Sequence, residues 1–382
     1  MLKIGIVGLG FMGKMHYRCY NSLENVRITA ICDADADQLK NSSGVSGNIS
    51  GAEQELDLSD KQLFSDFSQM LADTELDAVS IASPTFLHAS QTVEAIKSGV
   101  HVFCEKPMAL NSADCLQMAE AADQSGKALQ IGHCIRFWPE YVQAKEIIDS
   151  EKFGKVLAAT FQRLSLTPTW SWDNCFLDGK RSGGAMLDLH IHDTDYVQYV
   201  FGMPNEVFSR GVIGPSGDYD HTVTQYLYDD KKVITAEGGW IMAPEFGFEM
   251  SFKIMLENAT LLYSSAQQPT LKVCPKEGKM IVPEVPNGDG YFFEIQHFID
   301  LISGKQIKSI ITPEQSADSV RIIEAVKESV DNSLDACEEA RILPEIHVEI
   351  KRMKGDRLRL ITQDNGPGIP REDIENVFGK FL

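Results

Sequence analysis

The first thirteen residues, Met1–Gly13, read MLKIGIVGLGFMG and decide the fold of the chain around them. Ile4, Ile6 and Val7 are typical of a buried parallel strand, and the run ends in G-x-G-x-x-G. The first glycine allows a tight turn, the second lets the backbone approach a pyrophosphate, and the third lets the next helix pack on the strand. Unpaired N–H groups at the start of that helix favour phosphate. We therefore predict a dinucleotide site with contacts from Gly8, Gly10, Phe11, Met12 and Gly13.

The next apolar run, Val26–Cys32, ends on Asp33. A carboxylate at this distance from the glycines can accept both ribose hydroxyls of an adenosine, and it repels a 2′-phosphate. We therefore expect NAD as the cofactor rather than NADP. The alternative interpretation is that Asp33 only caps the following turn. We favour the cofactor interpretation, because strand, turn, helix and acid come in the required order.

Length and composition limit the remaining possibilities. The 382 residues predict two domains, and a hydrophobic content of 43% is ordinary for a globular enzyme. The net charge of −20 argues against nucleic acid and anionic membranes as partners of the main body. The eight cysteines form no C-x-x-C pair, which favours free thiols and a cytoplasmic location. The sequence has neither a signal-peptide pattern nor an apolar run of membrane-spanning length, so we expect no membrane partner.

Strands and helices alternate through the first third of the chain. The expected strand Asp77–Ala82 stops at Ser83-Pro84-Thr85, a helix follows from about His88, and the expected strand His101–Cys104 runs into Glu105-Lys106-Pro107. This alternation predicts an α/β fold with a doubly wound parallel sheet of the Rossmann type over residues 1–130. Ligands bind beyond the carboxyl ends of such strands. We therefore expect the residues at these ends to meet around one cofactor.

These motifs together resemble the Gfo/Idh/MocA family of nicotinamide-dependent oxidoreductases. The resemblance rests on the glycine turn, Asp33, the Ala82-Ser83-Pro84 segment with His88, and above all Glu105-Lys106-Pro107. It continues through Gly132-His133 and Arg136-Phe137 to Phe153–Val156 and covers roughly residues 1–330. It implies that Ser83, Pro84, Thr85, His88, Glu105 and Lys106 lie at the cofactor, and that Lys106 lies beside the nicotinamide and the substrate hydroxyl.

Lys106 also has an interpretation that does not depend on the family. A lysine at a strand end, before a proline and behind an apolar run, is partly desolvated and can hold a substrate oxygen. The alternative is a surface lysine paired with Glu105, and the spacing alone favours that alternative. The resemblance to the family favours catalysis.

A second candidate cluster lies in Ser182–Asp195, where two glycines precede a helical pattern ending at Phe201-Gly202. Asp188 and His192 are four residues apart and are expected on one helix face, with Asp195 one turn further. An imidazole there can take a hydroxyl proton while a carboxylate orients the substrate or the ring. Without a family, a helix-capping or packing role for Asp188 and His192 would be the default interpretation. The resemblance implies the catalytic role for His192 and the supporting role for Asp188.

Other interpretations of this region remain. His190-Ile191-His192-Asp193 could bind a metal ion, but alternating residues on a helix do not converge on one ion, so we expect no metal. Arg136 is a candidate for contact with substrate or cofactor. Trp172 lies in an aromatic segment, Pro168–Asp173, that could stack on a sugar or pack the domain interface.

Residues 131–327 are expected to form the substrate and oligomerisation domain. From Glu206 to Val273 the sequence alternates as antiparallel strands do, at Val207–Ile213, Thr222–Tyr228, Val233–Trp240, Phe246–Leu256 and Ala259–Tyr263. One face of such a sheet can cover the active site, and the other can join a second subunit. We therefore expect an α+β domain with a mostly antiparallel open sheet, in a homodimer or homotetramer. Helices from Tyr291 and from about Thr312 are those with which the family closes its fold on the cofactor domain.

From about Glu328 the sequence resembles the start of the GHKL ATP-binding fold, and residues 376–382 are similar to topoisomerase VI B, of the type IIB DNA topoisomerases. The resemblance implies that Glu328 activates water, Asn332 holds Mg²⁺ and Asp364 binds the adenine amino group. About 55 residues cannot bury a nucleotide by themselves. We therefore do not expect ATP or Mg²⁺ binding, and interpret residues 328–382 as a truncated GHKL-like tail joined by gene fusion or as a chimera.

The sequence thus predicts an NAD-dependent dehydrogenase that oxidises a secondary hydroxyl of a sugar, an inositol or a related polyol. One alternative keeps the same site, namely a redox-neutral NAD-dependent glycosidase of the same family. Two others are a non-catalytic NAD-binding sensor and an ATP-binding topoisomerase VI B fragment carried by the tail.

Overall fold

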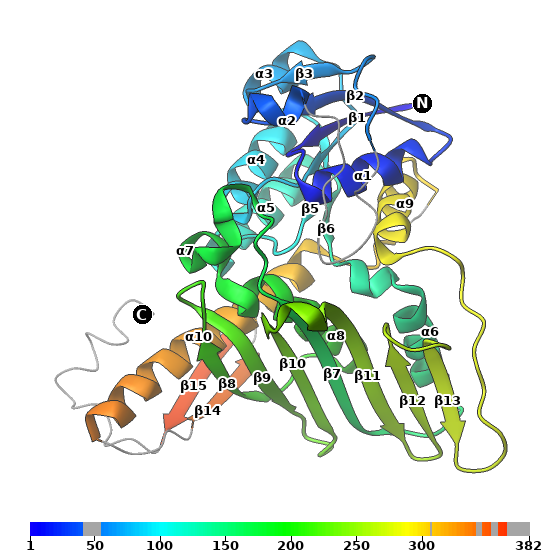
Figure 1. Cartoon of the computed structure of the whole chain (residues 1–382), viewed down its shortest axis with the longest axis vertical. Helices are drawn as coiled ribbons and strands as arrows, with labels where there is room; N and C mark the ends of the chain where they lie inside the picture. The colour runs from blue at the N-terminus through cyan, green and yellow to red at the C-terminus, as the bar shows by residue number, and fades with distance from the viewer. Residues whose placement is uncertain (41–54, 306–307, 341–345, 353–357, 365–382) are drawn as a thin grey trace.

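The computed structural model describes residues 1–40, 55–305, 308–340, 346–352 and 358–364 (Figure 1). These residues build two sheets, a six-stranded sheet A in the first third of the chain and a nine-stranded sheet B after it. A parallel Rossmann sheet followed by a mostly antiparallel sheet was the expected architecture, and it is confirmed. None of the helices in the described ranges combines the length and apolarity needed to cross a membrane.

Sheet A has the order β3-β2-β1-β4-β5-β6, and all its pairs are parallel. The strand order reverses beside β1, which pairs with β2 on one side and β4 on the other, and such a reversal leaves a crevice at the carboxyl ends. Helix α4 begins at Thr85, three residues before the expected start. The elements are β1 Leu2–Val7, α1 Phe11–Asn21, β2 Val26–Cys32, α2 Ala36–Lys40, β3 Gln62–Phe64, α3 Phe67–Asp73, β4 Ala78–Ile81, α4 Thr85–Lys97, β5 His101–Glu105, α5 Ser112–Ser125 and β6 Leu129–Gly132.

Sheet B has the order β13-β12-β11-β7-β10-β9-β8-β14-β15. The pair β7–β10 is parallel and the other pairs are antiparallel. Strand β7, the longest strand in the described ranges, was not predicted from the sequence. The elements are η1 Cys134–Phe137, α6 Pro139–Asp149, β7 Val156–Leu166, η2 Trp172–Leu177, α7 Gly179–Ser182, η3 Met186–His190, α8 Ile191–Phe201, β8 Glu206–Ile213, β9 Tyr219–Leu227, β10 Val233–Met242, η4 Pro244–Phe246, β11 Phe248–Leu256, β12 Ala259–Ser264 and β13 Leu271–Pro275.

One face of sheet B packs on helices through an aromatic core. Tyr141 of α6 meets Phe252 of β11 edge-on, with ring centroids 5.0 Å apart. Tyr196 of α8 meets Phe161 of β7 at 5.7 Å. Edge-to-face pairs at these distances are favourable beyond the burial of their area. The core therefore fixes α8 against the sheet and so positions the segment that carries Asp188 and His192.

Two late helices return to the first domain. Helix α9, Gly290–Ile302, packs against α1 and η1, and Figure 1 shows it beside α1. Helix α10, Pro313–Ala340, packs against α5 and α8. The expected closing role of these helices agrees with this packing. Helix α10 also crosses residue 328 without a break, so the expected junction with the tail lies inside one helix.

The tail adds two strands to sheet B. The expected strands, from His347 and from Leu358, are present as β14 Ile346–Arg352 and β15 Leu358–Asp364. Strand β14 pairs with β8, with Val348 opposite Val207, which the sequence did not predict. The glycine segment after Asp364 lies outside the described residues, as do the side chains of Glu328 and Asn332.

Candidate active site

A cavity of about 720 Å³ lies at the carboxyl ends of sheet A and reaches sheet B. Fourteen of the residues proposed from the sequence line it, and two, Gly13 and Arg136, do not. The fourteen are Gly8, Gly10, Phe11, Met12, Asp33, Ser83, Pro84, Thr85, His88, Glu105, Lys106, Trp172, Asp188 and His192.

The glycine turn fits a dinucleotide. Gly8 has φ of +86°, and a Cβ there would lie 2.7 Å from the carbonyl oxygen of Ala82, so only glycine fits. A Cβ at Gly10 would meet nothing within 4 Å, which leaves room for a phosphate to approach the backbone. A Cβ at Gly13 would lie 1.8 Å from the Gly8 carbonyl oxygen. Gly13 therefore serves the packing of α1 on β1, as expected of the third glycine.

Asp33 is held at the cavity wall by backbone groups. Its Oδ2 accepts a hydrogen bond from Leu9 N–H at 2.6 Å, and its Oδ1 accepts one from Asp35 N–H at 2.8 Å. A carboxylate oxygen has lone pairs for more than one donor, so ribose hydroxyls can still be accepted. Asp33 therefore bonds to the following turn, as the alternative interpretation expects, and it also lines the cavity.

His88 ties together the two loops that follow β4 and β5. Its Nδ1 lies 2.9 Å from the carbonyl oxygen of Pro107, and its Nε2 lies 2.9 Å from that of Ser83. The ring is buried, and burial lowers the pKa of His88. His88 therefore lines the cofactor end of the cavity and holds the two loops together.

Lys106 crosses from the first domain to the second. Its Nζ donates to the carbonyl oxygen of Asp188 at 2.8 Å and to Asp188 Oδ1 at 3.0 Å. Both side chains are 14% exposed, so the pair lies at the cavity wall and can reach a ligand. The alternative pairing of the ammonium with Glu105 is wrong, because Glu105 Oε1 instead lies 2.8 Å from His16 Nε2.

A neutral carboxyl group lies near Glu105. Glu294 of α9 is fully buried, and neither of its oxygens has a hydrogen-bond partner among the described residues. Burial, and then the charge of Glu105, raise the pKa of Glu294 well above its ordinary value. Glu294 is therefore protonated and adds no negative charge near Lys106.

Asp188 and His192 do not lie on one regular α-helix. Residues Met186–His190 form a π-helical turn, η3, and α8 begins only at Ile191. The expected convergence nevertheless holds, since both side chains line the cavity. Burial, and then the charges of Lys106 and Arg163, lower the pKa of His192 well below its ordinary value. The imidazole is therefore neutral near pH 7 and can accept a proton.

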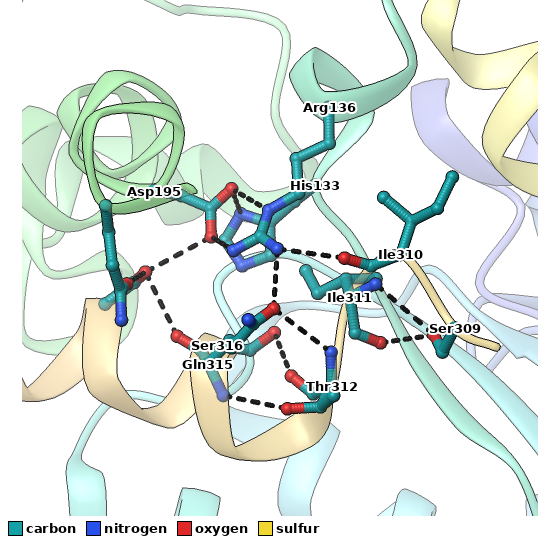
Figure 2. Close-up of polar contacts among 11 residues, drawn as sticks. His133, Arg136, Asp195, Ser309, Ile310, Ile311, Thr312, Gln315 and Ser316 are labelled. Carbon is teal, nitrogen blue, oxygen red and sulfur yellow. Dashed lines mark hydrogen bonds and ion pairs between the residues drawn. The ribbon is translucent and has the colours of Figure 1, made fainter. Parts of the chain in front are cut away.

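The prediction that Arg136 contacts the substrate or the cofactor is wrong, because Arg136 is not among the residues that line the cavity. It is fully buried and donates from Nε and NH2 to the two oxygens of Asp195, each at 2.8 Å (Figure 2). Its NH1 donates to Gln315 Oε1 at 2.7 Å and to the Ile310 carbonyl oxygen at 3.2 Å. Arg136 therefore joins α8 to the start of α10 and does not contact the cavity. Asp195 likewise faces this cluster and not the side of His192.

The residues of the alternating His-Ile-His-Asp segment point to different partners. His190 Nε2 lies 2.9 Å from Thr224 Oγ1, and Asp193 accepts two hydrogen bonds from Arg163. Within the described part of the chain, no group of three or more His, Cys, Asp or Glu side chains is placed to hold a metal ion.

Some lining residues were missed from the sequence. Arg163 and Ser165 reach the cavity from β7, and Trp240 reaches it from β10. The signal was the period-two alternation of β7, in which Ala159, Phe161, Arg163 and Ser165 all point inward. Two of those four inward residues are polar, which hides the alternation of hydrophobicity.

Family models match three parts of the chain. An oxidoreductase family with an NAD-binding Rossmann fold matches residues 2–133, and the GFO/IDH/MocA C-terminal domain matches residues 141–262. The chain belongs to the Gfo/Idh/MocA oxidoreductase family. It is therefore an NAD(P)-dependent oxidoreductase, as predicted. A third model, of histidine kinase-, DNA gyrase B- and HSP90-like ATPases, matches residues 317–382 of this Gfo/Idh/MocA protein, so the GHKL-like tail is confirmed. The likeness of the tail to topoisomerase VI B stays a prediction.

Known relatives of this Gfo/Idh/MocA oxidoreductase include inositol dehydrogenases. The myo-inositol 2-dehydrogenase of Thermotoga maritima is 26% identical over 287 residues, which are 72% of this chain and 79% of the relative. The 2,7-anhydro-N-acetylneuraminate hydratase of Mediterraneibacter gnavus is 31% identical over 210 residues, 54% of this chain and 51% of the relative. The structure of scyllo-inositol dehydrogenase from Lactobacillus casei, with bound NAD(H) and scyllo-inositol, is 25% identical with a TM-score of 0.69 and covers 86% of this chain and 96% of its own.

Proposed function

We propose that the protein oxidises a secondary hydroxyl of a sugar, an inositol or a related polyol with NAD⁺. The observation that carries the proposal is that Lys106, Asp188 and His192 line the same cavity as the glycine turn. When bound, NAD⁺ accepts the hydride that leaves the carbinol carbon. The hydroxyl proton goes to His192, so that a ketone and an imidazolium form.

Lys106 and Asp188 prepare the site for that step. The ammonium of Lys106 can hold the substrate oxygen as negative charge develops on it. Asp188 Oδ1, at 3.0 Å from Nζ, aims the ammonium along the cavity wall. His192 is neutral because burial and nearby cations lower its pKa, so it is able to accept the proton. Trp172, 51% exposed at the cavity, is the proposed stacking surface for the substrate.

Asp33 supports a preference for NAD over NADP. Its carboxylate is held at the cavity by Leu9 N–H and Asp35 N–H. A 2′-phosphate beside it would place two negative charges together, which is unfavourable.

The open face of sheet B supports a homo-oligomer, a homodimer or a homotetramer. Val212, Val223, Val233 and Ile241 are between 40% and 51% exposed on three adjacent strands of that sheet. Apolar side chains grouped on one surface mark a site of association.

A second candidate is a redox-neutral reaction at the same site, in which the substrate is oxidised, loses a group and is reduced again. The observation that favours this candidate is the similarity to a hydratase, at 31% identity over 210 residues. The two candidates use the same lysine and histidine. They differ in whether NADH accumulates.

The test uses the full-length protein and a panel of sugars, inositols and nucleotide sugars with NAD⁺ and NADP⁺. We expect a polyol to yield NADH, faster with NAD⁺ than with NADP⁺. His192→Asn is expected to lower kcat by about 10²–10⁴-fold, the usual contribution of a general base, and to leave NAD⁺ binding unchanged. His221→Asn is the control, since His221 is not among the residues that line the cavity.

Three results would count against the dehydrogenase proposal. His192→Asn with the kcat of the parent would remove the proposed base. Release of a leaving group without net NADH would favour the redox-neutral candidate. NAD⁺ binding without turnover of any compound would favour a sensor.

A further inference from the structure

Both cations among the described residues that line the cavity are already paired with carboxylates. Lys106 Nζ lies 3.0 Å from Asp188 Oδ1. Arg163 donates from Nε and NH2 to the two oxygens of Asp193 at 3.0 and 3.1 Å, and these two side chains are only 3% and 0% exposed. A bidentate, desolvated pair of this kind is strong. An anionic substituent on a substrate would therefore meet cations whose charge a carboxylate already balances.

Carboxylates also outnumber cations along the lining. Burial lowers the pKa of His192 well below its ordinary value, so this imidazole adds no positive charge. Asp33 and Asp35 belong to the cofactor end, just after β2. The charges that bear on a substrate are those of Lys106 and Arg163, and each is balanced by the carboxylate with which it pairs. The lining acids are Asp33, Asp35, Glu105 and Asp188, against the cations Lys106 and Arg163.

Aromatic side chains supply much of the remaining lining. The chain has four tryptophans, and all four line this cavity, at Trp138, Trp170, Trp172 and Trp240. Phe176 lies against Trp240 with ring centroids 5.9 Å apart. Large aromatic faces bind the C–H side of a ring and gain from burial without a charged partner.

We infer that the substrate is an uncharged cyclic polyol, held against tryptophan faces, and that sugar acids, sugar phosphates and nucleotide sugars are poor substrates. This inference rests on the proposed function, because it concerns the same cavity. What it adds is a preference of the enzyme for the neutral over the anionic members of one sugar series.

The test compares two matched pairs that differ in one anionic group, glucose with glucuronate and glucose with glucose 6-phosphate. N-acetylglucosamine with its UDP derivative is a third comparison, in which a nucleoside is added together with the charge. The holoenzyme with NAD⁺ is assayed for NADH, and binding is followed by tryptophan fluorescence, which reports the cavity because all four tryptophans line it. We expect kcat/KM for the neutral member of a pair to exceed that for the anionic member by at least about tenfold. Equal values, or preference for an anionic member, would overturn the inference and leave the dehydrogenase standing. NADH from no compound would overturn the proposed function and the inference together.

A variant tests whether the ion pair of Arg163 and Asp193 causes the preference for neutral substrates. Asp193→Asn leaves the Arg163 cation without its carboxylate, so the preference for neutral members is expected to fall several-fold. The double change Arg163→Gln with Asp193→Asn removes both charges and is expected to keep the preference. An unchanged preference in a folded Asp193→Asn protein, or its loss in the double variant, would refute the role given to this pair.

Discussion

Two ion pairs join the strand ends of sheet A to residues 186–201. Each pairs a basic side chain with an aspartate, but the two pairs differ in their exposure and in the groups around them. Lys106 follows β5 and pairs with Asp188, whereas Arg136 follows the neighbouring β6 and pairs with Asp195. The first pair is 14% exposed on each side and lines the cavity. The second is fully buried and continues into Gln315 of α10 (Figure 2). Burial, and not residue type, thus separates a pair that can meet a substrate from one that holds the domains together.

The largest effect is expected from breaking the buried pair. Arg136→Met leaves Asp195 charged in a dry environment and without the two hydrogen bonds from the guanidinium, so that the hydrogen bond from Ser319 remains. We therefore expect the free energy of unfolding to fall by about 3–5 kcal/mol. Urea unfolding of the full chain measures it. Arg136→Met with Asp195→Leu removes both charges and is expected to recover much of the loss. A single variant as stable as the parent would show that the pair is not structural.

The matching change in the exposed pair is expected to affect catalysis instead. Lys106→Met removes the donor proposed for the substrate oxygen, and the loss of one such group costs roughly 10²–10³-fold in kcat. Stability is expected to change little, because Asp188 stays partly exposed to water. Steady-state kinetics and urea unfolding of the same sample separate the two outcomes. Full activity in Lys106→Met would contradict the comparison, as would a loss of stability like that of Arg136→Met.

The sequence predicted four of the six strands of sheet A, because their signals are local, and it did not predict β3 and β6. Strand, glycine turn and helix follow one another at Met1–Gly13, and the residues that line the cofactor end of the cavity lie just after β1, β2, β4 and β5. Lys106 and His192 were assigned to the site through the resemblance to the family, because their spacing alone favoured other roles. These positions depend on the ends of single strands and on one short helical segment.

What the sequence could not predict depends on residues far apart in the chain. Arg136 was assigned to the substrate because its buried partners, Asp195 and Gln315, lie 59 and 179 residues away. The π-helical turn η3 has no distinct residue pattern, so a regular helix was expected over Asp188 and His192. Strand β7 was missed because Arg163 and Ser165 take inward positions that are usually apolar.

The smallest effect concerns the imidazole beside the buried pair. His133 is 1% exposed, and its Nδ1 lies 3.6 Å from Asp195 Oδ2. Burial lowers the pKa of His133 to about 4, although Asp195 opposes that shift. Between about pH 4 and 6.5 the unfolded chain therefore takes up a proton that the folded chain does not, so stability is complete above pH 6.5 and falls as the solution is acidified, by at most about 3 kcal/mol.

His133→Asn removes this proton and is expected to flatten the dependence of the unfolding free energy on pH in that range. His221→Asn is the matched control, because His221 is 18% exposed and lies beside Glu237 instead. The parent and the control should lose stability alike on acidification, and His133→Asn should lose less. Because His133 and His221 are not among the residues that line the cavity, NAD⁺ binding should be the same in all three proteins at pH 7. If the unfolding free energy of His133→Asn depended on pH as steeply as that of the parent, the acid sensitivity would arise from other groups. The buried cluster would then stabilise the fold without taking part in its dependence on pH.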